Sequence, residues 1–242
     1  MPRHAQLVVL MSPARIGGRR SSVLLRPEAD FALAERLRCR KATLGEAYAF
    51  ISGLYFRGKL AYAKAFAAPP EGLQPAFVIV PGLGLIPPDT MVDAEQLRRM
   101  GDVSIRETNQ AYRDPLLRDA RQLDQDAGAA CQFLLLGSIA TEKYTEPLLN
   151  VFGDRLLFPA EFVGRGDMSR GGLMLRRASS GEELSYVSLR GAIRRGRRPP
   201  KLDPWVKPLA IHLDTKKHSF DCSYQKLINK PLDPPKQGLA KL

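Results

Sequence analysis

Residues 7–13, Leu7-Val8-Val9-Leu10-Met11-Ser12-Pro13, decide the fold. Five consecutive apolar residues end in a serine and a proline, which is typical of a β-strand buried on both faces of a parallel sheet. Three other short runs predict further strands of that sheet, because a sheet covered by helices on both faces has strands that are apolar throughout. These runs are residues 77–80, 131–136 and 155–159.

Helical periodicity separates these strands. The segments that predict helices are residues 28–41, 44–67, 113–129 and 145–152. Gly53 and Gly58 interrupt the second segment, so we expect two helices around a turn there. Residues 173–177 and 184–189 are expected to form a late antiparallel pair of strands. Strands that alternate with helices predict the α/β fold class, a single domain with a mostly parallel sheet flanked by helices.

The character of the chain changes after about residue 190. A dense basic run closes at Pro199-Pro200, and the sequence beyond it is rich in proline and lysine with little periodicity. We therefore predict an α/β domain over residues 1–190 and a basic C-terminal extension over residues 191–242. Residues 199–242 are expected to be an extended, partly disordered tail.

The charge balance favours a polyanionic partner. The chain has 242 residues, 44% of them hydrophobic, and a formal net charge of +12. This composition supports one sizeable core and favours binding to DNA, RNA or an acidic membrane surface. The apolar run at residues 7–11 is too short for a secretion signal, and no stretch approaches the length of a bilayer span. We therefore expect a cytoplasmic protein that does not enter a membrane.

The cysteines and histidines do not form a recognisable ligand pattern. Cys39, Cys131 and Cys222 are widely spaced without a CxxC motif, which argues against a disulfide scaffold and against a zinc finger. No Walker A sequence or metal-ligand spacing occurs, so we expect no metal and no cofactor. Cys131 opens an apolar strand and is expected in the core. Cys39 lies among cations that would lower the pKa of an exposed thiol.

Residues 164–172, Gly-Arg-Gly-Asp-Met-Ser-Arg-Gly-Gly, concentrate polar chemistry among four glycines. Glycine lets a backbone approach a ligand, and the arginine fork matches phosphate oxygens or base edges. We interpret the segment as one wall of a nucleotide or nucleic-acid site; the alternative is a glycine-rich turn with solvated arginines. Asp167 and Glu161 are the general acid–base candidates, and Arg165 and Arg170 the candidates for polarising a substrate.

The loops after the predicted strands are small, polar or glycine-rich. In an open α/β sheet such loops meet at the carboxyl edge, where ligands bind. We therefore expect Ser12, Arg15, Ser138, Asp167 and Arg170 to converge on one cleft. Two further binding residues are expected beside it, Lys143 and Ser169.

Residues 52–59 place two aromatic residues beside two cations. Tyr55 would stack on an unstacked or flipped base while Arg57 and Lys59 hold phosphates. The alternative is a helix interior with Tyr55 and Phe56 in the core. Four arginines of the basic run are expected to contact phosphates by counterion release: Arg194, Arg195, Arg197 and Arg198.

Four segments, in order, resemble the YaaA family, first described as a peroxide-stress group. Ser12-Pro13-Ala14-Arg15 is similar to the Ser-Pro-Ala-Lys that ends the family's first strand. Residues 82–89 resemble a Gly-Leu-Tyr-Gly-type turn with a following proline and aspartate, and residues 136–144 a strand followed by Ser-x-x-Tyr. Residues 164–170 resemble the family's late Ala-Arg-Gly-x-Met-Ser-Arg signature. The likeness covers residues 7–177. It departs at Arg15, where the family has lysine, and in the basic C-terminal extension.

The resemblance implies an α/β domain with a positively charged cleft that binds DNA. One branch, DpdC, belongs to a 7-deazaguanine DNA modification system and is associated with hydrating the nitrile of 7-cyano-7-deazaguanine in DNA to the amide. Our leading hypothesis is an enzyme of this kind that acts on a flipped modified base in duplex DNA. Arg165 and Arg170 would polarise the nitrile and Asp167 would transfer protons. The alternatives are a non-enzymatic DNA-binding protein of oxidative-stress or damage protection and a base-excision DNA glycosylase.

Overall fold

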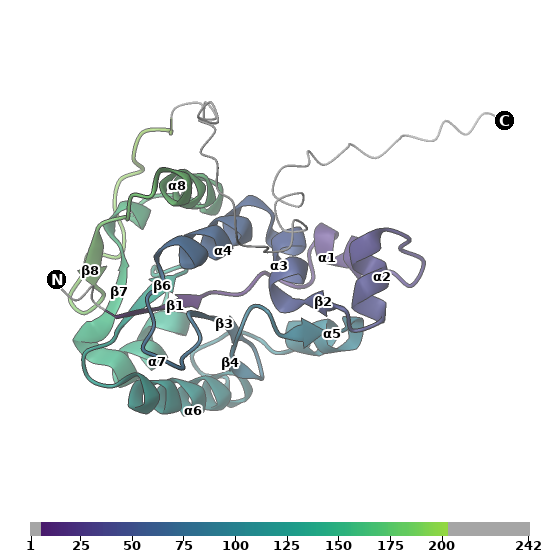
Figure 1. Cartoon of the computed structure of the whole chain (residues 1–242), viewed down its shortest axis with the longest axis horizontal. Coiled ribbons are helices and arrows are strands. Elements are labelled where there is room, and N and C mark those ends of the chain that lie inside the picture. The colour runs from purple at the N-terminus through teal and green to yellow at the C-terminus, as the bar shows by residue number, and fades with distance from the viewer. Residues whose placement is uncertain (1–5, 203–242) are drawn as a thin grey trace, which may run out of the picture. The chain divides into compact units, whose positions relative to one another are not determined.

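The computed structural model describes residues 6–202, which form an α/β domain around a six-stranded sheet (Figure 1). The strand order is β4-β3-β1-β6-β7-β8. The pairs β3–β1, β1–β6 and β6–β7 are parallel, and β4 and β8 are antiparallel edge strands. The bounds are Leu7–Met11 for β1, Ala76–Val80 for β3, Gly84–Ile86 for β4, Gln132–Leu136 for β6, Leu156–Pro159 for β7 and Tyr186–Ser188 for β8. The predicted fold class and the four predicted parallel strands are confirmed.

Strand β1 is buried along its whole length because helices cover both faces of the sheet. Val9 and Met11 pack into one core with α3 (Leu44–Ser52), α4 (Leu54–Phe66) and α8 (Asp167–Ser180). Val8 and Leu10 pack into the other core with α6 (Gln110–Ala127) and α7 (Glu142–Phe152). Figure 1 shows α4 and α8 on one side of β1 and α6 and α7 on the other. Alternate side chains of one strand therefore support two separate helix layers.

A smaller antiparallel pair stands beside the main sheet and was not predicted. It joins β2 (Ala42–Thr43) to β5 (Met91–Val92). Capping boxes at Thr43 and Asp93 begin α3 and α5 (Ala94–Asp102), because each side chain accepts a backbone N–H of the first turn. The remaining elements are α1 (Arg19–Leu24), α2 (Ala32–Arg38), and the 3₁₀ turns η1 (Gly153–Arg155) and η2 (Ala160–Phe162). The helix predicted over residues 28–41 is confirmed over 32–38.

The two glycines of residues 44–67 have different roles. Gly53 separates α3 from α4 with a φ of +61°, so the predicted break is confirmed there. Gly58 lies inside α4 and marks a close contact with α8. A Cβ at Gly58 would lie 2.6 Å from the carbonyl oxygen of Gly171, and a Cβ at Gly171 would lie 2.7 Å from that of Leu54. The absence of both side chains lets the two helix backbones touch.

The predicted strand at residues 173–177 is wrong. These residues belong to α8, which starts at Asp167 and therefore includes most of the glycine-rich segment. Gly171 and Gly172 lie inside this helix rather than in a loop, and Gly171 packs against the backbone of α4. Residues 184–189 do contain a strand, β8, whose antiparallel partner is β7.

The start of the predicted C-terminal extension lies against the domain. Arg194 Nη1 donates to Thr145 Oγ1 at 3.3 Å, and Arg195 Nη2 donates to the Ala140 carbonyl at 3.3 Å. The segment also approaches Gly164, where a Cβ would lie 2.3 Å from the Arg197 carbonyl oxygen. Residues 203–242, which include nearly all of the predicted tail, lie outside the described residues. Within residues 6–202, none of the helices combines the length and apolar character needed to cross a membrane.

Candidate functional site

A buried lysine and a serine meet at the carboxyl end of β1. Ser12 directly follows the strand, and Lys59 lies in the second turn of α4. The Lys59 ammonium donates to Ser12 Oγ at 2.7 Å and to the Ser12 carbonyl oxygen at 2.8 Å. Lys59 is 1% exposed and Ser12 is 5% exposed. A fully buried lysine is rare in proteins unless it is paired, so the Lys59–Ser12 contact is a candidate functional site.

The packing of α4 brings Lys59 to this position. Tyr55, Phe56, Lys59 and Tyr62 follow the spacing of one helix face and are all buried against the sheet. The Lys59 nitrogen lies 4.0 Å from the centre of the Tyr55 ring and 5.6 Å from that of Phe56. Aromatic faces attract a cation, and they hold the amine beside Ser12.

Burial controls the charge of Lys59. Desolvation lowers the pKa of the Lys59 ammonium to about 7, with the Asp167 carboxylate raising it and the Arg170 guanidinium lowering it. Near neutral pH the side chain therefore exchanges readily between an ammonium, which donates, and a free amine, which accepts a proton. A lysine with this pKa is suited to general base work.

The first turn of α8 supplies the charges nearest this pair. Arg170 is buried, and its Nε and Nη2 donate to the Phe162 carbonyl oxygen at 3.2 and 2.9 Å. Its Nη1 lies 3.8 Å from Oδ1 of Asp167, whose side chain is 69% exposed. Arg170 is therefore held by the segment after β7. Asp167 pairs with this buried arginine while its own side chain is open to solvent.

Two tyrosines complete the cluster. The Tyr55 hydroxyl is buried beside Arg170 and makes no hydrogen bond of normal geometry. Burial raises the pKa of Tyr55 to about 12, which keeps this hydroxyl protonated and able to donate. Burial also raises the pKa of Tyr144, at the start of α7, with contributions from Tyr55 and Asp167. A buried hydroxyl without a partner of normal geometry costs about 1–3 kcal/mol, so Tyr55 is a candidate donor to a ligand at this site.

The carboxyl end of β6 closes on Ser12. A Cβ at Gly137 would lie 3.0 Å from Ser12 Cβ and 3.2 Å from Ser12 Oγ, so a side chain at this position would require Ser12 to move by a few tenths of an ångström. Half-buried Ser138 follows in the chain. The structure thus brings Ser12, Asp167 and Arg170 around Lys59, with Ser138 next to Gly137 at the same edge of the sheet.

Other predicted binding residues differ in exposure. Tyr55 and Lys59 are buried, so in this structure Tyr55 does not offer a free face for a base and Lys59 does not reach a backbone phosphate. The interior-helix alternative for Tyr55 and Phe56 is therefore the one that the structure supports. Arg15 is exposed and Arg57 is half-buried. Lys143 is half-buried with its nitrogen 5.0 Å from the Tyr144 ring.

Arg165, in the loop after β7, contacts both α8 and the end of the basic segment, which comprises residues 190–201. Arg165 Nη1 donates to Ser169 Oγ at 3.2 Å and to the Pro200 carbonyl at 3.3 Å. Its Nε is buried without a hydrogen-bond partner. Of the four arginines in the basic run, Arg194 is half-buried and three are exposed: Arg195, Arg197 and Arg198. The Arg194 and Arg195 side chains lie at the carboxyl edge of the sheet that carries the buried cluster, because they contact Thr145 and Ala140 after β6.

The remaining acid and thiol candidates lie in different surroundings. Glu161 accepts from the Ser185 N–H at 3.1 Å, and its other oxygen is buried without a partner. Cys131 is in the core, as predicted, and burial raises the pKa of its thiol. Cys39 is exposed. Within residues 6–202 no group of three or more His, Cys, Asp and Glu side chains is arranged to hold a metal ion.

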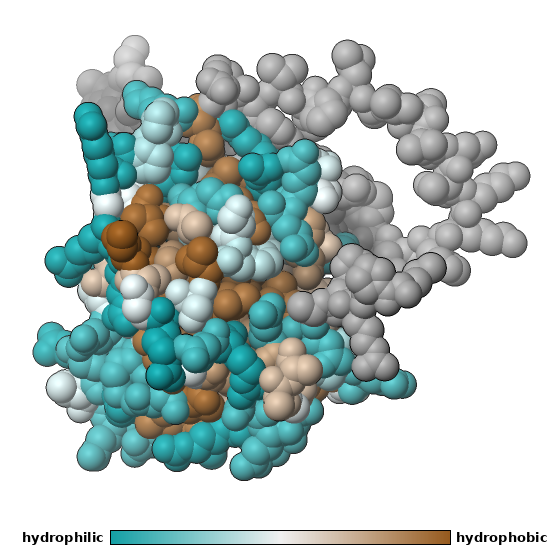
Figure 2. Space-filling model, turned by 90° about the vertical axis from the view of Figure 1, so that its left-hand side faces the viewer, coloured by the Kyte–Doolittle hydropathy of each residue, from teal (hydrophilic) through white to brown (hydrophobic). Residues whose placement is uncertain are grey.

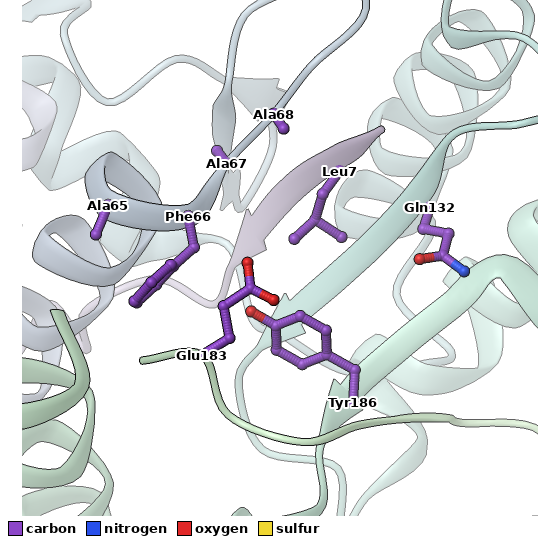
Figure 3. A pocket seen from close by; sticks show the side chains of 8 residues that line it. All are labelled: Leu7, Ala65, Phe66, Ala67, Ala68, Gln132, Glu183 and Tyr186. Carbon is purple, nitrogen blue, oxygen red and sulfur yellow. The ribbon is translucent and has the colours of Figure 1, made fainter. Parts of the chain in front are cut away.

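The surface has a hollow at the other end of α4. This hollow has a volume of about 270 Å³ and lies beside Leu7 and Gln132, which begin β1 and β6. Figure 3 shows the Glu183 carboxylate and the Tyr186 hydroxyl pointing toward each other across it. Figure 2, which views the molecule from the side of β8, shows hydrophobic residues scattered among hydrophilic ones. The hollow is at the amino edge of the sheet, whereas Ser12 and Lys59 are at the carboxyl edge.

Comparison of the chain with protein-family models, with curated proteins and with solved structures gave no match. The Lys59–Ser12 contact is the feature that sequence reasoning missed. Its only sequence signal is a lysine on the apolar face of a predicted helix, in register with Tyr55 and Tyr62.

Proposed function

We propose that this protein is a DNA-binding enzyme that acts on a base at the carboxyl edge of its sheet. The observation that carries the proposal is the position of the basic segment. Arg194 and Arg195 contact the start of α7 and the loop before it, next to the edge that holds Lys59 and Ser12. Cations that neutralise phosphates and a buried polar cluster suited to proton transfer thus occupy the same side of the domain.

The candidate reaction is the hydration of a nitrile on 7-cyano-7-deazaguanine in DNA. It comes from the resemblance of residues 7–177 to the YaaA family, and the structure contributes the chemistry that such a reaction needs. Hydration requires a base for the attacking oxygen and a donor for the nitrile nitrogen. Lys59 in its neutral form supplies the base, and the Tyr55 hydroxyl and Arg170 guanidinium supply donors.

DNA binding is tested through its salt dependence. Replacing Arg194, Arg195, Arg197 and Arg198 by Gln gives a four-arginine variant that should flatten the slope of log K against log salt by roughly 0.9 per lost phosphate contact. The control removes the same charge from four exposed arginines on other surfaces: Arg26, Arg99, Arg106 and Arg121. Equal slopes for the two variants would show that these four arginines act only through the net charge of the protein and do not contact phosphates.

The reaction is tested by mass spectrometry of digested DNA. Duplex DNA that carries 7-cyano-7-deazaguanine should gain the mass of one water per modified base when incubated with the full chain. Lys59→Met should abolish turnover with little loss of DNA binding, because the buried amine supplies the base but does not reach a backbone phosphate. No mass gain with the wild-type protein would contradict the hydration and favour the non-enzymatic alternative, whereas release of a free base would favour the glycosylase.

A further inference from the structure

We infer that Ser12 is a nucleophile and Lys59 its general base, in a serine–lysine pair that attacks an electrophilic carbon of the nitrile or acyl class. The inference rests on the proposed function for the nitrile as substrate. It goes further by naming the atom that forms a covalent bond. The pair has the geometry expected of an activated nucleophile, since Lys59 Nζ and Ser12 Oγ are 2.7 Å apart.

The amine is oriented by groups other than the serine hydroxyl. It donates to the Ser12 carbonyl oxygen and lies 4.0 Å from the Tyr55 ring centre. The Ser12 carbonyl oxygen and the Tyr55 ring thus fix the position of the nitrogen, and serine with lysine is a known variant of the nucleophile–base arrangement. Gly137 also lies close to Ser12, since a Cβ there would be 3.2 Å from Ser12 Oγ.

The surroundings allow the amine to be neutral. The groups that face it are the Tyr55 and Phe56 rings on α4, and Asp167 and Arg170 on α8. Burial outweighs the single carboxylate and lowers the pKa of Lys59 to about 7. A solely structural lysine that holds the strand end needs only the bond to the carbonyl oxygen. The additional contact with the side-chain oxygen, at 2.7 Å, places the neutral amine within reach of the Ser12 hydroxyl proton.

The covalent step joins Ser12 Oγ to the nitrile carbon. Neutral Lys59 takes the Ser12 hydroxyl proton while Oγ bonds to the nitrile carbon, and the resulting ammonium protonates the nitrile nitrogen to give an imidate ester. Lys59 then takes a proton from water as its oxygen adds to the same carbon, and returns that proton to nitrogen. The C–Oγ bond breaks, the added hydroxyl becomes the amide carbonyl, and its proton returns to Ser12 through Lys59. One water is consumed and no oxidant or metal is needed.

The test uses a small sulfonyl fluoride on the full chain in the absence of DNA. Phenylmethanesulfonyl fluoride should modify Ser12, located by peptide mapping, with loss of fluoride and a rate that is half-maximal near pH 7. Ser21 is an internal control, because it is buried and its hydroxyl donates to the Gly18 carbonyl. Ser12→Ala should lose the label, and Lys59→Met should slow labelling by about 100-fold or more. Lys64→Met, an exposed lysine on the same helix, should label like the wild type.

Ser12→Cys distinguishes a blocked site from an inactive serine. If iodoacetamide modifies this cysteine while the wild-type serine is never sulfonylated, the site is accessible and the serine is not activated, which overturns the inference. If neither reagent reacts at residue 12 in folded protein, small electrophiles do not reach the pair, which also overturns it. Because no DNA is present, these results are independent of the failure or success of the DNA-binding and hydration experiments.

Discussion

Replacing Lys59 by Met should remove a specific pH dependence of stability. The unfolded lysine keeps its proton up to its ordinary pKa of 10.5, whereas the folded lysine, with a pKa of about 7, has lost it by pH 8. The unfolded state therefore binds more protons between pH 7 and pH 10.5, and the free energy of unfolding rises with pH across that window. Below about pH 7 both states are protonated and the contribution to the slope disappears.

The magnitude follows from the two pKa values. Each unit of difference corresponds to about 1.4 kcal/mol, so Lys59 should add about 2 kcal/mol to the free energy of unfolding between pH 7 and pH 9. At any single pH the Met variant also loses two hydrogen bonds to Ser12, each with a net value of about 1 kcal/mol. The sign of its stability change at one pH is therefore not diagnostic, but the change with pH is.

The assay is urea unfolding of wild-type protein, Lys59→Met and Lys64→Met at pH 7, 8 and 9. The difference between wild type and Lys59→Met should change by about 2 kcal/mol over this range, while Lys64→Met should follow the wild type. Lys64→Met removes an exposed lysine and therefore controls for the loss of one positive charge. A difference between wild type and Lys59→Met that stays constant from pH 7 to pH 9 would refute the account of Lys59 as a desolvated amine.

Three further predictions concern the packing of α8 on α4, the effect of Asp167 on Lys59, and the four arginines of residues 194–198. Gly171→Ala should lower the free energy of unfolding by about 1–3 kcal/mol, because its Cβ would lie 2.7 Å from the Leu54 carbonyl oxygen. Gly172→Ala is the control and should be near neutral, because its Cβ would lie 3.6 Å from Leu202. Equal melting temperatures for the two variants would contradict this packing. Asp167→Asn should shift the midpoint of Ser12 sulfonylation to lower pH, since the Asp167 carboxylate raises the pKa of Lys59; an unchanged midpoint would separate the two groups. The four-arginine variant should bind duplex DNA with a flatter salt slope than the charge-matched control, measured by fluorescence anisotropy.

The parallel sheet and most of its helices were predictable because their signals are local. Residues 7–11 are apolar at every position, as expected of a strand covered on both faces, and the structure places them at the centre of the sheet. The loop composition after each strand also predicted that Ser12, Asp167 and Arg170 lie at the same edge, because that edge follows from parallel pairing.

The errors arose where packing overrides local preference. Gly171 and Gly172 look like loop residues, yet they lie inside α8, because Gly171 contacts the backbone of α4 across a separation in sequence that no local pattern reveals. Five residues at 173–177 are too few to distinguish a strand from a helix. The late strand at 186–188 therefore pairs with β7 and not with residues 173–177.

The amino-acid sequence by itself determined the α/β class, the buried central strands and the basic character of the chain, since these depend on composition and on the spacing of apolar residues. Only the tertiary structure decided that Lys59 is a buried amine rather than a surface cation. Its hydrogen bond to Ser12 joins residues 47 positions apart, and its pKa depends on burial and on charges contributed by α8. Desolvation acts in three dimensions, so no pattern along the chain expresses it.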